Sequence, residues 1–453
     1  MALDPKVFKA YDVRGIYPSE LDETGAYAVG RAYVEQFEPK AIAIGRDMRV
    51  SSPAIARAVM QGASDGGAEV VDVGMIGTEM LYFGVGELDL DGGVMVTASH
   101  NPKEYTGMKI VRRGALPVGG DSGLLDVRDR AQTIESSELI DDPPAEGVDI
   151  YPAFVERVLS FIDVGAVKPL RVVIDAGNGM AGAMLPPILK RLPVDAVRCF
   201  FEPDGTFPNH EPNPLLPENR EFVIGKVRDE QADLGIAFDG DADRCFFVDD
   251  TGEFVPGDFV TALLAESMLE KEPGAKIIYD VRASWAVPNI AEQHGGTPLV
   301  NRVGHAFIKE RMRKEGALFG GEVSGHYYFR DFNQADSGTI PALLMLELAS
   351  KRGKPLSELL RPFRERYFLT GEINTPVPDV ALKLQELKEH FAGEGEISHL
   401  DGISVTAKDW HLNVRPSNTE PLLRLNLEAL APDLMVEKRD EALAVIRGEG
   451  LVS

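Results

Sequence analysis

The sequence predicts an α/β protein with several domains, and three observations support this prediction. Short apolar runs alternate with helical stretches along the chain, which is the pattern of α/β folds. Three openings resemble one another, namely AIAIGRD from Ala41, VVIDAGN from Val172 and IIYDVRA from Ile277. The chain also has 453 residues, well beyond the size of about 250–300 residues at which a single core stops growing.

The three openings lie a domain-sized distance apart, and each combines an apolar run, a polar loop and a helical pattern. The polar stretch Ser136–Asp149 contains prolines and is interpreted as a linker, while the turn-rich stretch from Asp249 indicates a second boundary. We therefore expect three similar α/β domains with mixed sheets over residues 1–148, 149–250 and 251–366.

A smaller domain of a different kind is expected at the end of the chain. Ala381–Phe391 has a helical pattern, and the runs ISVT, HLNV and LLRLNLEA that follow it are typical of strands. We expect an α+β domain over residues 367–453.

Composition narrows the classes of partner. The net charge of −25 disfavours sequence-blind binding to nucleic acid or to a membrane surface. No segment approaches the roughly 20 apolar residues of a membrane helix, and the N-terminus has no signal-peptide pattern. Cys199 and Cys245 make neither a metal pattern nor a disulfide framework. We expect a cytoplasmic protein that binds neither nucleic acid nor membrane.

The stretch VMVTASHNPKEYTGMKI carries the first candidate chemistry. Ser99 follows the apolar strand Val94–Thr97, in a turn forced by Pro102. A hydroxyl at the carboxyl end of a strand lies where α/β proteins place ligands, and it can carry a phosphoryl group covalently. The alternative is an ordinary Asn-Pro turn, and these residues alone do not decide between the two.

The stretch FDGDADRCFFVDD contains the second group of candidate functional residues. Asp239, Asp241 and Asp243 alternate after a strand-like run, and three carboxylates so close together repel one another unless a cation lies among them. Oxygen ligands suit Mg2+, so a metal site is favoured over a solvated acidic turn. Arg244 follows at once and could hold a phosphate or a carboxylate.

The stretch FGGEVSGHYYFRD contains the third group of candidate functional residues. Glu322, Ser324 and His326 again alternate, so that their side chains share a face if the loop is extended. Carboxylate, hydroxyl and imidazole groups on one face suit the recognition of neighbouring sugar hydroxyls. The alternative is a Gly-rich turn with a satisfied histidine.

Two further stretches contain candidate phosphate ligands. NVRPSNTEP offers one guanidinium group, two hydroxyls and an amide, which suit a phosphate cradle, although a plain turn before a strand has the same pattern; these groups belong to Arg415, Ser417, Asn418 and Thr419. Near the N-terminus Arg14 could meet phosphate and Tyr11 could wall a sugar site, although in isolation a structural role is favoured for both. The loop GRDMRVSSP, with Arg46, Arg49 and Ser51, is a weaker phosphate candidate, and a helix cap at Ser52 with Pro53 opening the helix is favoured there.

The order of these motifs is more specific than any one of them. TASHNP, DGDADR, GEVSGH and RPSNTEP, in this order, strongly resemble the α-D-phosphohexomutase superfamily over essentially the whole chain. Within it the sequence is similar to the phosphomannomutase and phosphoglucomutase group, and GHYYFRDF and RPSNTEPLLRLN are most similar to the phosphomannomutases. The resemblance implies three similar α/β domains around a central cleft and a fourth domain like the TATA-binding protein.

The resemblance also implies a mechanism. Ser99 is similar to the serine that carries the phosphoryl group and joins the three aspartates around Mg2+. A hexose phosphate is the implied substrate, a hexose 1,6-bisphosphate the implied intermediate and activator, and a monomer or homodimer the expected assembly. Further roles in proton transfer, in sugar contact and in phosphate binding are implied for His100, Lys109, His326, Glu322, Ser324, Gly304, His305, Arg415, Ser417, Asn418 and Thr419.

Two positions depart from the family pattern, and several alternatives stay open. Arg282 replaces a common lysine, and Val323 replaces a common methionine, which leaves the choice of sugar open. An aspartyl-phosphate phosphatase acting through Asp239 explains fewer motifs, and a non-catalytic sugar-phosphate sensor leaves intact chemistry unused. Asn418 argues against a phosphoglucosamine mutase, which tends to have glycine there, while no motif distinguishes mannose from glucose.

Overall fold

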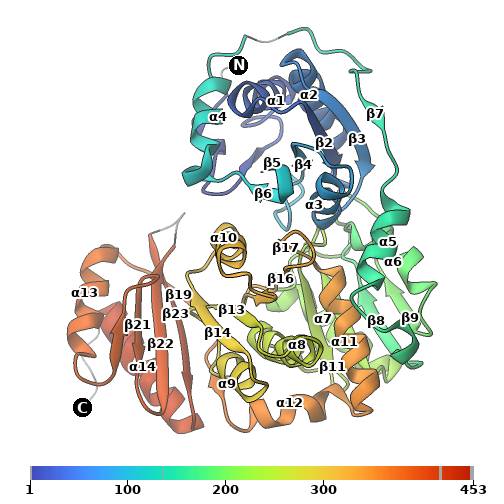
Figure 1. Cartoon of the computed structure of the whole chain (residues 1–453). Coiled ribbons are helices and arrows are strands. Elements are labelled where there is room, and N and C mark those ends of the chain that lie inside the picture. Colours follow the sequence, from blue (N-terminus) through green and yellow to red (C-terminus); the bar gives the residue numbers. More distant parts are fainter. Residues whose placement is uncertain (1–2, 136, 418–420, 449–453) are drawn as a thin grey trace. The chain divides into compact units, whose positions relative to one another are not determined.

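Each of the three similar openings forms the central strand of a parallel trio (Figure 1). All six pairings are parallel and have the same order, and the trios are β3 (Glu69–Met75), β2 (Ala41–Arg46) and β4 (Gly92–Val96); β9 (Asp195–Cys199), β8 (Arg171–Asp175) and β10 (Leu234–Phe238); and β14 (Thr297–Asn301), β13 (Lys276–Asp280) and β15 (Phe319–Gly321). This repeated order confirms the prediction of three similar α/β domains.

The computed structural model describes residues 3–135, 137–417 and 421–448. It divides into two compact units, Met1–Val255 with Ser324–Leu356, and Pro256–Val323 with Ser357–Ser453. Residues of the third predicted domain thus belong to both units. The boundaries at residues 148, 250 and 366 stay predictions.

The first sheet of the first unit adds antiparallel strands to its parallel trio. These are β5 (Tyr105–Arg112) beside β4, β1 (Val13–Ile16) beside β5, and the short β6 (Leu116–Pro117). The stretch interpreted as a linker contains one short strand, β7 (Glu146–Gly147), which pairs in parallel with β3. The helices of this part are α1 (Glu23–Phe37), α2 (Ser52–Asp65), α3 (Thr78–Glu87) and α4 (Leu124–Ala131).

Helices α1 and α2 pack side by side on this sheet (Figure 1). Their backbones meet at two glycines, because a Cβ on Gly30 would lie 2.4 Å from the carbonyl oxygen of Val59, and one on Gly62 would lie 2.1 Å from that of Tyr27. Only glycine allows so close an approach.

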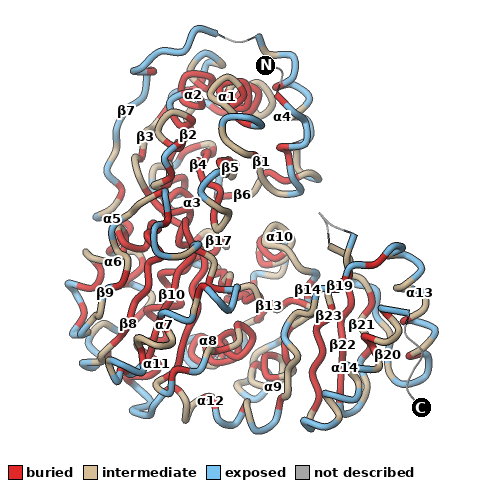
Figure 2. Tube along the Cα trace, turned by 180° about the vertical axis from the view of Figure 1, so that it is seen from behind, coloured by how far each residue is buried: buried red, intermediate tan, exposed pale blue. Residues whose placement is uncertain are grey.

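The second sheet follows the same plan, and its central strands are buried throughout. Strand β11 (Cys245–Asp249) is antiparallel to β10, and both are largely apolar runs whose residues are all buried (Figure 2), as expected for a sheet that helices cover on both faces. The other elements of the first unit are β12 (Phe254–Val255), α5 (Tyr151–Leu159), α6 (Ala181–Leu189), α7 (Pro217–Glu230), β16 (Tyr327–Phe329), β17 (Ala335–Asp336) and α11 (Thr339–Arg352). Short 3-10 turns occur at Pro5–Val7, Arg113–Ala115, Gly120–Ser122 and Val164–Ala166.

The second unit holds the third parallel trio and the C-terminal domain. Its helices are α8 (Gly257–Lys271), α9 (Ala286–Gln293), α10 (His305–Glu315), α12 (Leu356–Arg364), α13 (Val380–His390) and α14 (Pro432–Arg447), and its remaining strands are β18 (Phe368–Leu369), β19 (Ile373–Pro376), β20 (Glu396–Ser398), β21 (Ile403–Thr406), β22 (Trp410–Pro416) and β23 (Leu422–Ala429). The last four strands form an antiparallel sheet, β20-β21-β22-β23, with β18 and β19 beside β23. The helix and the three strands predicted for this α+β domain are confirmed.

This C-terminal sheet has one apolar and one polar face because its side chains alternate. Leu412, Val414, Leu423 and Leu425 face the core formed with α13 and α14. The opposite face pairs His411 with Glu428, Asn413 with Asn426, and Arg415 with Arg424.

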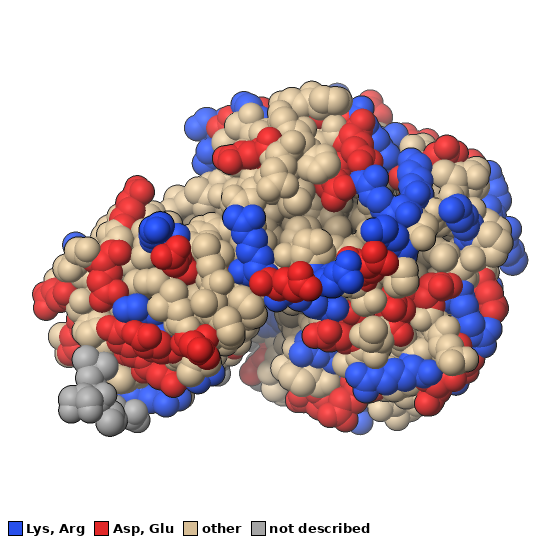
Figure 3. Space-filling view, turned by 90° about the horizontal axis from the view of Figure 1, so that it is seen from below, with Lys and Arg blue, Asp and Glu red and all other residues tan. Residues whose placement is uncertain are grey.

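Charged side chains of both signs lie on the surface. Figure 3 shows basic side chains interspersed among acidic ones on the face in view. Among the described residues, no helix combines the length and the apolar character that crossing a membrane requires.

Glu79 links two distant parts of the first unit. It lies in the first turn of α3, fully buried, and accepts hydrogen bonds from the Ser337 hydroxyl, from the Thr339 hydroxyl and from the backbone N–H of Thr339 at 3.2 Å. Burial raises the pKa of this carboxyl to about 8, against an ordinary value of 4.5, although the hydrogen bonds act in the opposite direction.

This raised pKa predicts a pH-dependent stability. Between pH 4.5 and 8 the folded protein keeps the proton of Glu79 and the unfolded chain does not, so the free energy of unfolding falls as pH rises, by on the order of 5 kcal/mol across this window. Glu79→Gln carries no such proton. We expect the Tm of the parent protein to fall more steeply from pH 5 to 9 than that of the variant.

The matched control is Glu87→Gln, on the exposed end of the same helix. Its thermal unfolding should follow the parent protein at every pH. Parallel curves for the parent protein and Glu79→Gln would contradict the prediction.

Candidate active site

Ser99 lies in a tight loop just after β4. Its backbone is in the left-handed region at φ 50°, which non-glycine residues rarely adopt and which is concentrated at functional sites. The Ser99 N–H donates to the Thr97 hydroxyl at 2.9 Å, and the residue is buried. The loop therefore holds the serine in one fixed orientation.

Arg49 stabilises the conformation of this loop through hydrogen bonds to its backbone. Its guanidinium group donates to the carbonyl oxygens of Ser99 at 2.8 Å and Asn101 at 2.6 Å, and to those of Pro102 at 2.8 Å and Tyr105 at 3.2 Å. The side chain is 1% exposed. Arg49 was a weak phosphate candidate in the sequence; the structure instead assigns it to the serine loop, because both of its terminal nitrogens are bonded to carbonyl oxygens of that loop.

The three aspartates follow β10 and lie against Ser99. Ligand atoms of Asp239, Asp241 and Asp243 all fall within 4.8 Å of one another, and all three residues are buried. The Ser99 hydroxyl donates to Asp239 at 3.1 Å. A Cβ on Gly240 would lie 2.5 Å from the Ser99 carbonyl oxygen, so a glycine is needed there for the two loops to meet.

Two cations balance these carboxylates in part. The Lys109 ammonium group lies 2.7 Å from Asp241 and 2.5 Å from Asp243, and the Arg244 guanidinium group lies 2.8 Å from Asp239. One oxygen each of Asp241 and Asp243 is buried without a hydrogen-bond partner. Buried acceptors without donors are costly. Together with the oxygen-only donor set, they show that this cluster could bind a metal ion.

The electrostatics of the cluster follow from burial and from these pairs. Burial and repulsion from Asp241 raise the pKa of Asp243 well above its usual value. Burial alone would also raise the pKa of Asp241, but attraction to Lys109 lowers it below its ordinary value. For Lys109, burial opposes the charge, yet the two carboxylates hold its pKa well above normal. Lys109 is therefore a permanent cation.

His100 stands next to the serine hydroxyl. Its Nδ1 lies 3.1 Å from the Ser99 Oγ. Burial, together with the positive charges of Arg244 and Arg14, lowers the pKa of His100 well below its usual value. The imidazole is thus held in its neutral form, in which one ring nitrogen can accept a proton.

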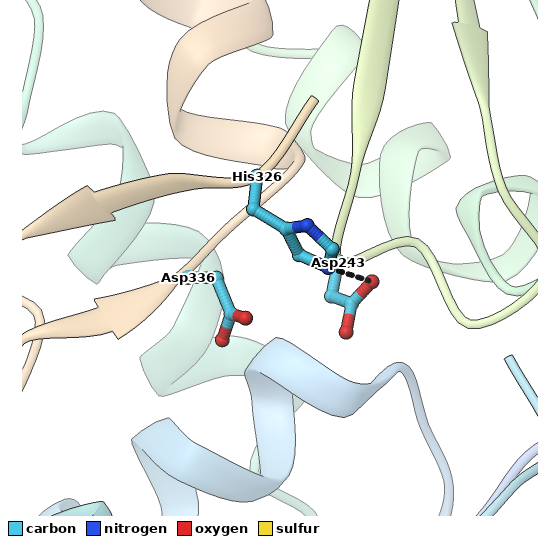
Figure 4. Close-up of side chains that lie close together, drawn as sticks. All are labelled: Asp243, His326 and Asp336. Atoms are coloured by element: carbon cyan, nitrogen blue, oxygen red, sulfur yellow. Dashed lines mark ion pairs between the residues drawn. The ribbon is translucent and has the colours of Figure 1, made fainter. Parts of the chain in front are cut away.

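The histidine of the sugar motif approaches the same cluster (Figure 4). His326 Nε2 lies 3.9 Å from Asp243, and its Nδ1 lies 3.1 Å from the Ser324 hydroxyl. Residues 323–325 form a turn with Gly325 at φ 85°, which is the Gly-rich turn that the sequence offered as the alternative to an extended loop.

Sequence reasoning missed two residues of this site. Asp336, on β17, forms a second group of metal-ligand type with Asp243 and His326 (Figure 4). Thr78 donates to an Asp241 carboxylate oxygen at 2.5 Å, and its N–H donates to the Asp241 carbonyl oxygen at 3.0 Å. Neither residue lies in a recognisable motif, since Thr78 merely starts a helix and Asp336 belongs to a two-residue strand.

Near the N-terminus, Arg14 supports the serine loop. It donates to the side chain of Asn101 and forms an ion pair with Asp12. Tyr11 is half-buried nearby in sequence. The predicted contacts of Arg14 and Tyr11 with substrate stay predictions.

The other predicted sugar contacts belong to the second unit. The buried Glu322 accepts a hydrogen bond from the Gly304 N–H at 3.0 Å, and His305 begins α10. Gly304 has a φ of 127°, a conformation that favours glycine. Arg282 grips the Asp280 carboxylate through two nitrogens, at 2.8 and 2.9 Å.

The predicted phosphate ligands lie at the end of β22. Arg415 is buried and its guanidinium group lies 3.3 Å from Glu372. The Ser417 N–H donates to the Leu422 carbonyl oxygen at 3.0 Å. Asn418 and Thr419 lie outside the described residues.

Comparison with known proteins identifies the class. The chain matches the phosphoglucomutase/phosphomannomutase alpha/beta/alpha domains I, II and III over residues 5–137, 152–252 and 256–367, and the C-terminal domain over 372–444. It is 45% identical to a phosphomannomutase of Salmonella montevideo, covering 96% of this chain and 97% of that protein. It is 43% identical to phosphohexose mutases of Xanthomonas campestris, covering 97% and 99%.

A solved structure agrees in fold. The phosphoglucomutase/phosphomannomutase family protein of Burkholderia thailandensis superposes with a TM-score of 0.89 at 32% identity, covering 100% of this chain and 99% of that one. Fold and sequence thus define a phosphohexomutase, an isomerase that works by phosphoryl transfer. The chain belongs to the phosphoglucomutase/phosphomannomutase family.

The role of Arg49 can be tested by Arg49→Lys. An ammonium group cannot reach four carbonyl oxygens in the plane of a guanidinium group, so buried acceptors lose their donors. We expect a loss of about 3 kcal/mol in stability, measured by urea unfolding, and a loss of mutase turnover, measured by a coupled assay. Arg57→Lys, an exposed change on α2, is the control. Unchanged stability in Arg49→Lys would contradict the assignment.

Proposed function

We propose that this protein is a phosphomannomutase, which interconverts mannose 6-phosphate and mannose 1-phosphate through phosphorylated Ser99 and a hexose 1,6-bisphosphate. The observation that carries the proposal is the placement of Ser99. Its hydroxyl lies 3.1 Å from Asp239, in a strained loop and beside a buried cluster of three carboxylates. The sequence likeness to phosphomannomutases over nearly the full chain supports the choice of sugar.

The proposed reaction has two phosphoryl transfers. The free hydroxyl of the sugar phosphate attacks the phosphorus on Ser99, the bond between phosphorus and Oγ breaks, and the sugar becomes a bisphosphate. After the bisphosphate intermediate reorients in the site, its other phosphate is transferred back to Ser99. The charge spread over the phosphoryl oxygens in each transition state calls for fixed cations nearby.

Lys109 and His100 suit different parts of this chemistry. Lys109 keeps its proton, because its pKa lies well above the ordinary value, and so it supplies fixed positive charge. His100 is neutral and 3.1 Å from the Ser99 hydroxyl, so it can exchange a proton with that oxygen. His326, 3.9 Å from Asp243, is a further candidate for orienting the phosphoserine.

We propose Mg2+ as the metal of the acidic cluster, with a hexose 1,6-bisphosphate as activator. Asp239, Asp241 and Asp243 would hold the ion together with an oxygen of phosphorylated Ser99, since all are hard oxygen donors. When bound, Mg2+ stabilises negative charge on the phosphoryl oxygens. Lys109 and Arg244 orient the carboxylates that bind it.

Substrate contacts complete the proposal. Glu322, Ser324, Gly304 and His305 would contact the sugar hydroxyls, and Arg415 with Ser417, Asn418 and Thr419 would hold the phosphate that is not being transferred. Tyr11, Arg14, Arg244 and Arg282 would line the site. The phosphate on carbon 1 and the phosphate on carbon 6 must bind in turn to this same group of residues. The group therefore has to release its phosphate between the two transfers.

A second activity, on glucose phosphates, is favoured by one observation. The Xanthomonas campestris relatives carry the broader name phosphohexose mutases at 43% identity. Mannose and glucose differ only in the configuration at carbon 2. Discrimination between the two sugars therefore depends on the contacts of a single hydroxyl group.

The choice of sugar is tested by one coupled assay. Mannose 1-phosphate, glucose 1-phosphate and glucosamine 1-phosphate are compared at equal concentration, with Mg2+ and a bisphosphate activator. We expect the highest kcat/KM for mannose 1-phosphate. A higher value for glucose 1-phosphate would replace the proposed activity by that of a phosphoglucomutase.

The role of Ser99 predicts both a mass and a rate. Part of the isolated protein should carry one additional phosphoryl group, located at this residue. Ser99→Ala should lack that mass and lose turnover by at least about 1,000-fold, because the covalent carrier is gone. Ser19→Ala, an exposed change in the same domain, should keep the additional phosphoryl group and the turnover rate of the parent protein. Full turnover in Ser99→Ala would sink the proposal.

A further inference from the structure

Two arginines face each other across the last two long strands of the C-terminal domain. Arg415 on β22 pairs directly with Arg424 on β23, on the polar face of the sheet. Like charges in directly opposed positions destabilise a sheet. An anion between the two guanidinium groups would remove this cost.

Glu372, just before β19, supplies one such anion. Its carboxylate lies 2.9 Å from Arg424 and 3.3 Å from Arg415, with a longer contact of 3.4 Å to Arg282. Arg282 is already neutralised by Asp280, which it grips through two nitrogens. Glu372 is therefore shared mainly between Arg415 and Arg424.

One carboxylate does not satisfy both guanidinium groups. The Nε atoms of Arg415 and Arg424 are buried without a hydrogen-bond partner, and Arg415 is only 8% exposed. Arg415, Arg424 and Glu372 together keep one uncompensated positive charge. In an acidic protein of net charge −25, a partly buried positive excess of this kind indicates a site for an external anion.

Arg424 also reaches the loop that was predicted to bind phosphate. Its Nη2 donates to the Ser417 hydroxyl at 3.5 Å, a long contact. Because Arg415 begins this loop and Arg424 lies opposite to it, both guanidinium groups face the same end of the sheet. A phosphate bound at Arg415 would lie within reach of Arg424.

We infer that Arg424 binds the substrate phosphate together with Arg415, and that Glu372 is an internal competitor which yields these guanidinium groups to the phosphate. The inference rests on the proposed function for the identity of the phosphate ester, but the anion site itself stands on the contacts above. Exchange of one ion pair for another makes binding weaker than two free arginines would allow. This suits a clamp that must release the bisphosphate between two transfers.

The test measures the affinity of inorganic phosphate for the full chain by calorimetry. Glu372→Gln keeps the shape of the side chain and removes the competing charge, so we expect phosphate to bind at least about 5-fold more tightly. Arg424→Gln removes one charged donor, so we expect binding about 10-fold weaker. In turnover, Glu372→Gln should lower KM and also lower kcat, because release becomes slow.

Two exposed changes in the same domain serve as matched controls. Glu396→Gln and Arg447→Gln alter the same charges outside this cluster, and both should bind phosphate like the parent protein. Circular dichroism and Tm establish that each variant is folded. Should Glu372→Gln not fold, Arg424→Gln with its control still tests the binding role of Arg424.

The outcomes separate this inference from the proposed function. Equal or weaker phosphate binding in Glu372→Gln would show that Glu372 merely orients the arginines, and unchanged binding in Arg424→Gln would remove Arg424 from the site; either result overturns the inference. A protein that binds phosphate as expected but turns over no hexose phosphate would overturn the proposed function and leave the anion site standing.

Discussion

The site depends on one electrostatic constraint, the burial of three carboxylates in a single five-residue stretch. Asp239, Asp241 and Asp243 cannot all be charged in a dry environment without cations. Lys109 and Arg244 provide two positive charges, at 2.5–2.8 Å. The surrounding elements place these cations and the serine next to the aspartates. Strand β5 carries Lys109, the loop after β4 carries Ser99, and the start of α3 adds the Thr78 hydroxyl.

Close backbone contact is what makes this arrangement rigid. Gly240 lets the metal loop approach the Ser99 carbonyl oxygen, and Gly77 lies so close to Asp241 that a Cβ there would be 2.9 Å from its carbonyl oxygen. Arg49 then fixes the other side of the serine loop through four carbonyl oxygens. The strained conformation of Ser99, at φ 50°, needs this support, because the backbone would relax without it.

The sequence predicted the parts of this structure that follow from local pattern. Apolar runs followed by polar loops located the central strands β2, β8 and β13, and alternation located β21 to β23. The aspartate spacing pointed to a metal cluster because the three residues are neighbours in the chain. Thr78 and Asp336 were not found as site residues, and Arg49 was named only as a weak phosphate candidate, because their roles arise from contacts with segments far away in sequence. The turn at residues 323–325, with Gly325 at φ 85°, was one of two interpretations that the sequence left open, because alternating polar residues are compatible with an extended loop and with a Gly-rich turn.

The two units show opposite solutions to the same physical problem. In the first, three buried carboxyl groups meet two cations, which leaves unsatisfied oxygens on Asp241 and Asp243. In the second, Arg415 and Arg424 meet the single carboxylate of Glu372, which leaves one positive charge and unsatisfied Nε atoms. Each cluster carries its own partial counter-charge, so that it can stay folded and still bind. A cluster without internal counter-ions would be unstable, while a fully neutralised one would have no affinity for a ligand. A partial internal counter-charge at each place therefore suits the proposed binding and release of a cation at the first cluster and of a phosphate at the second.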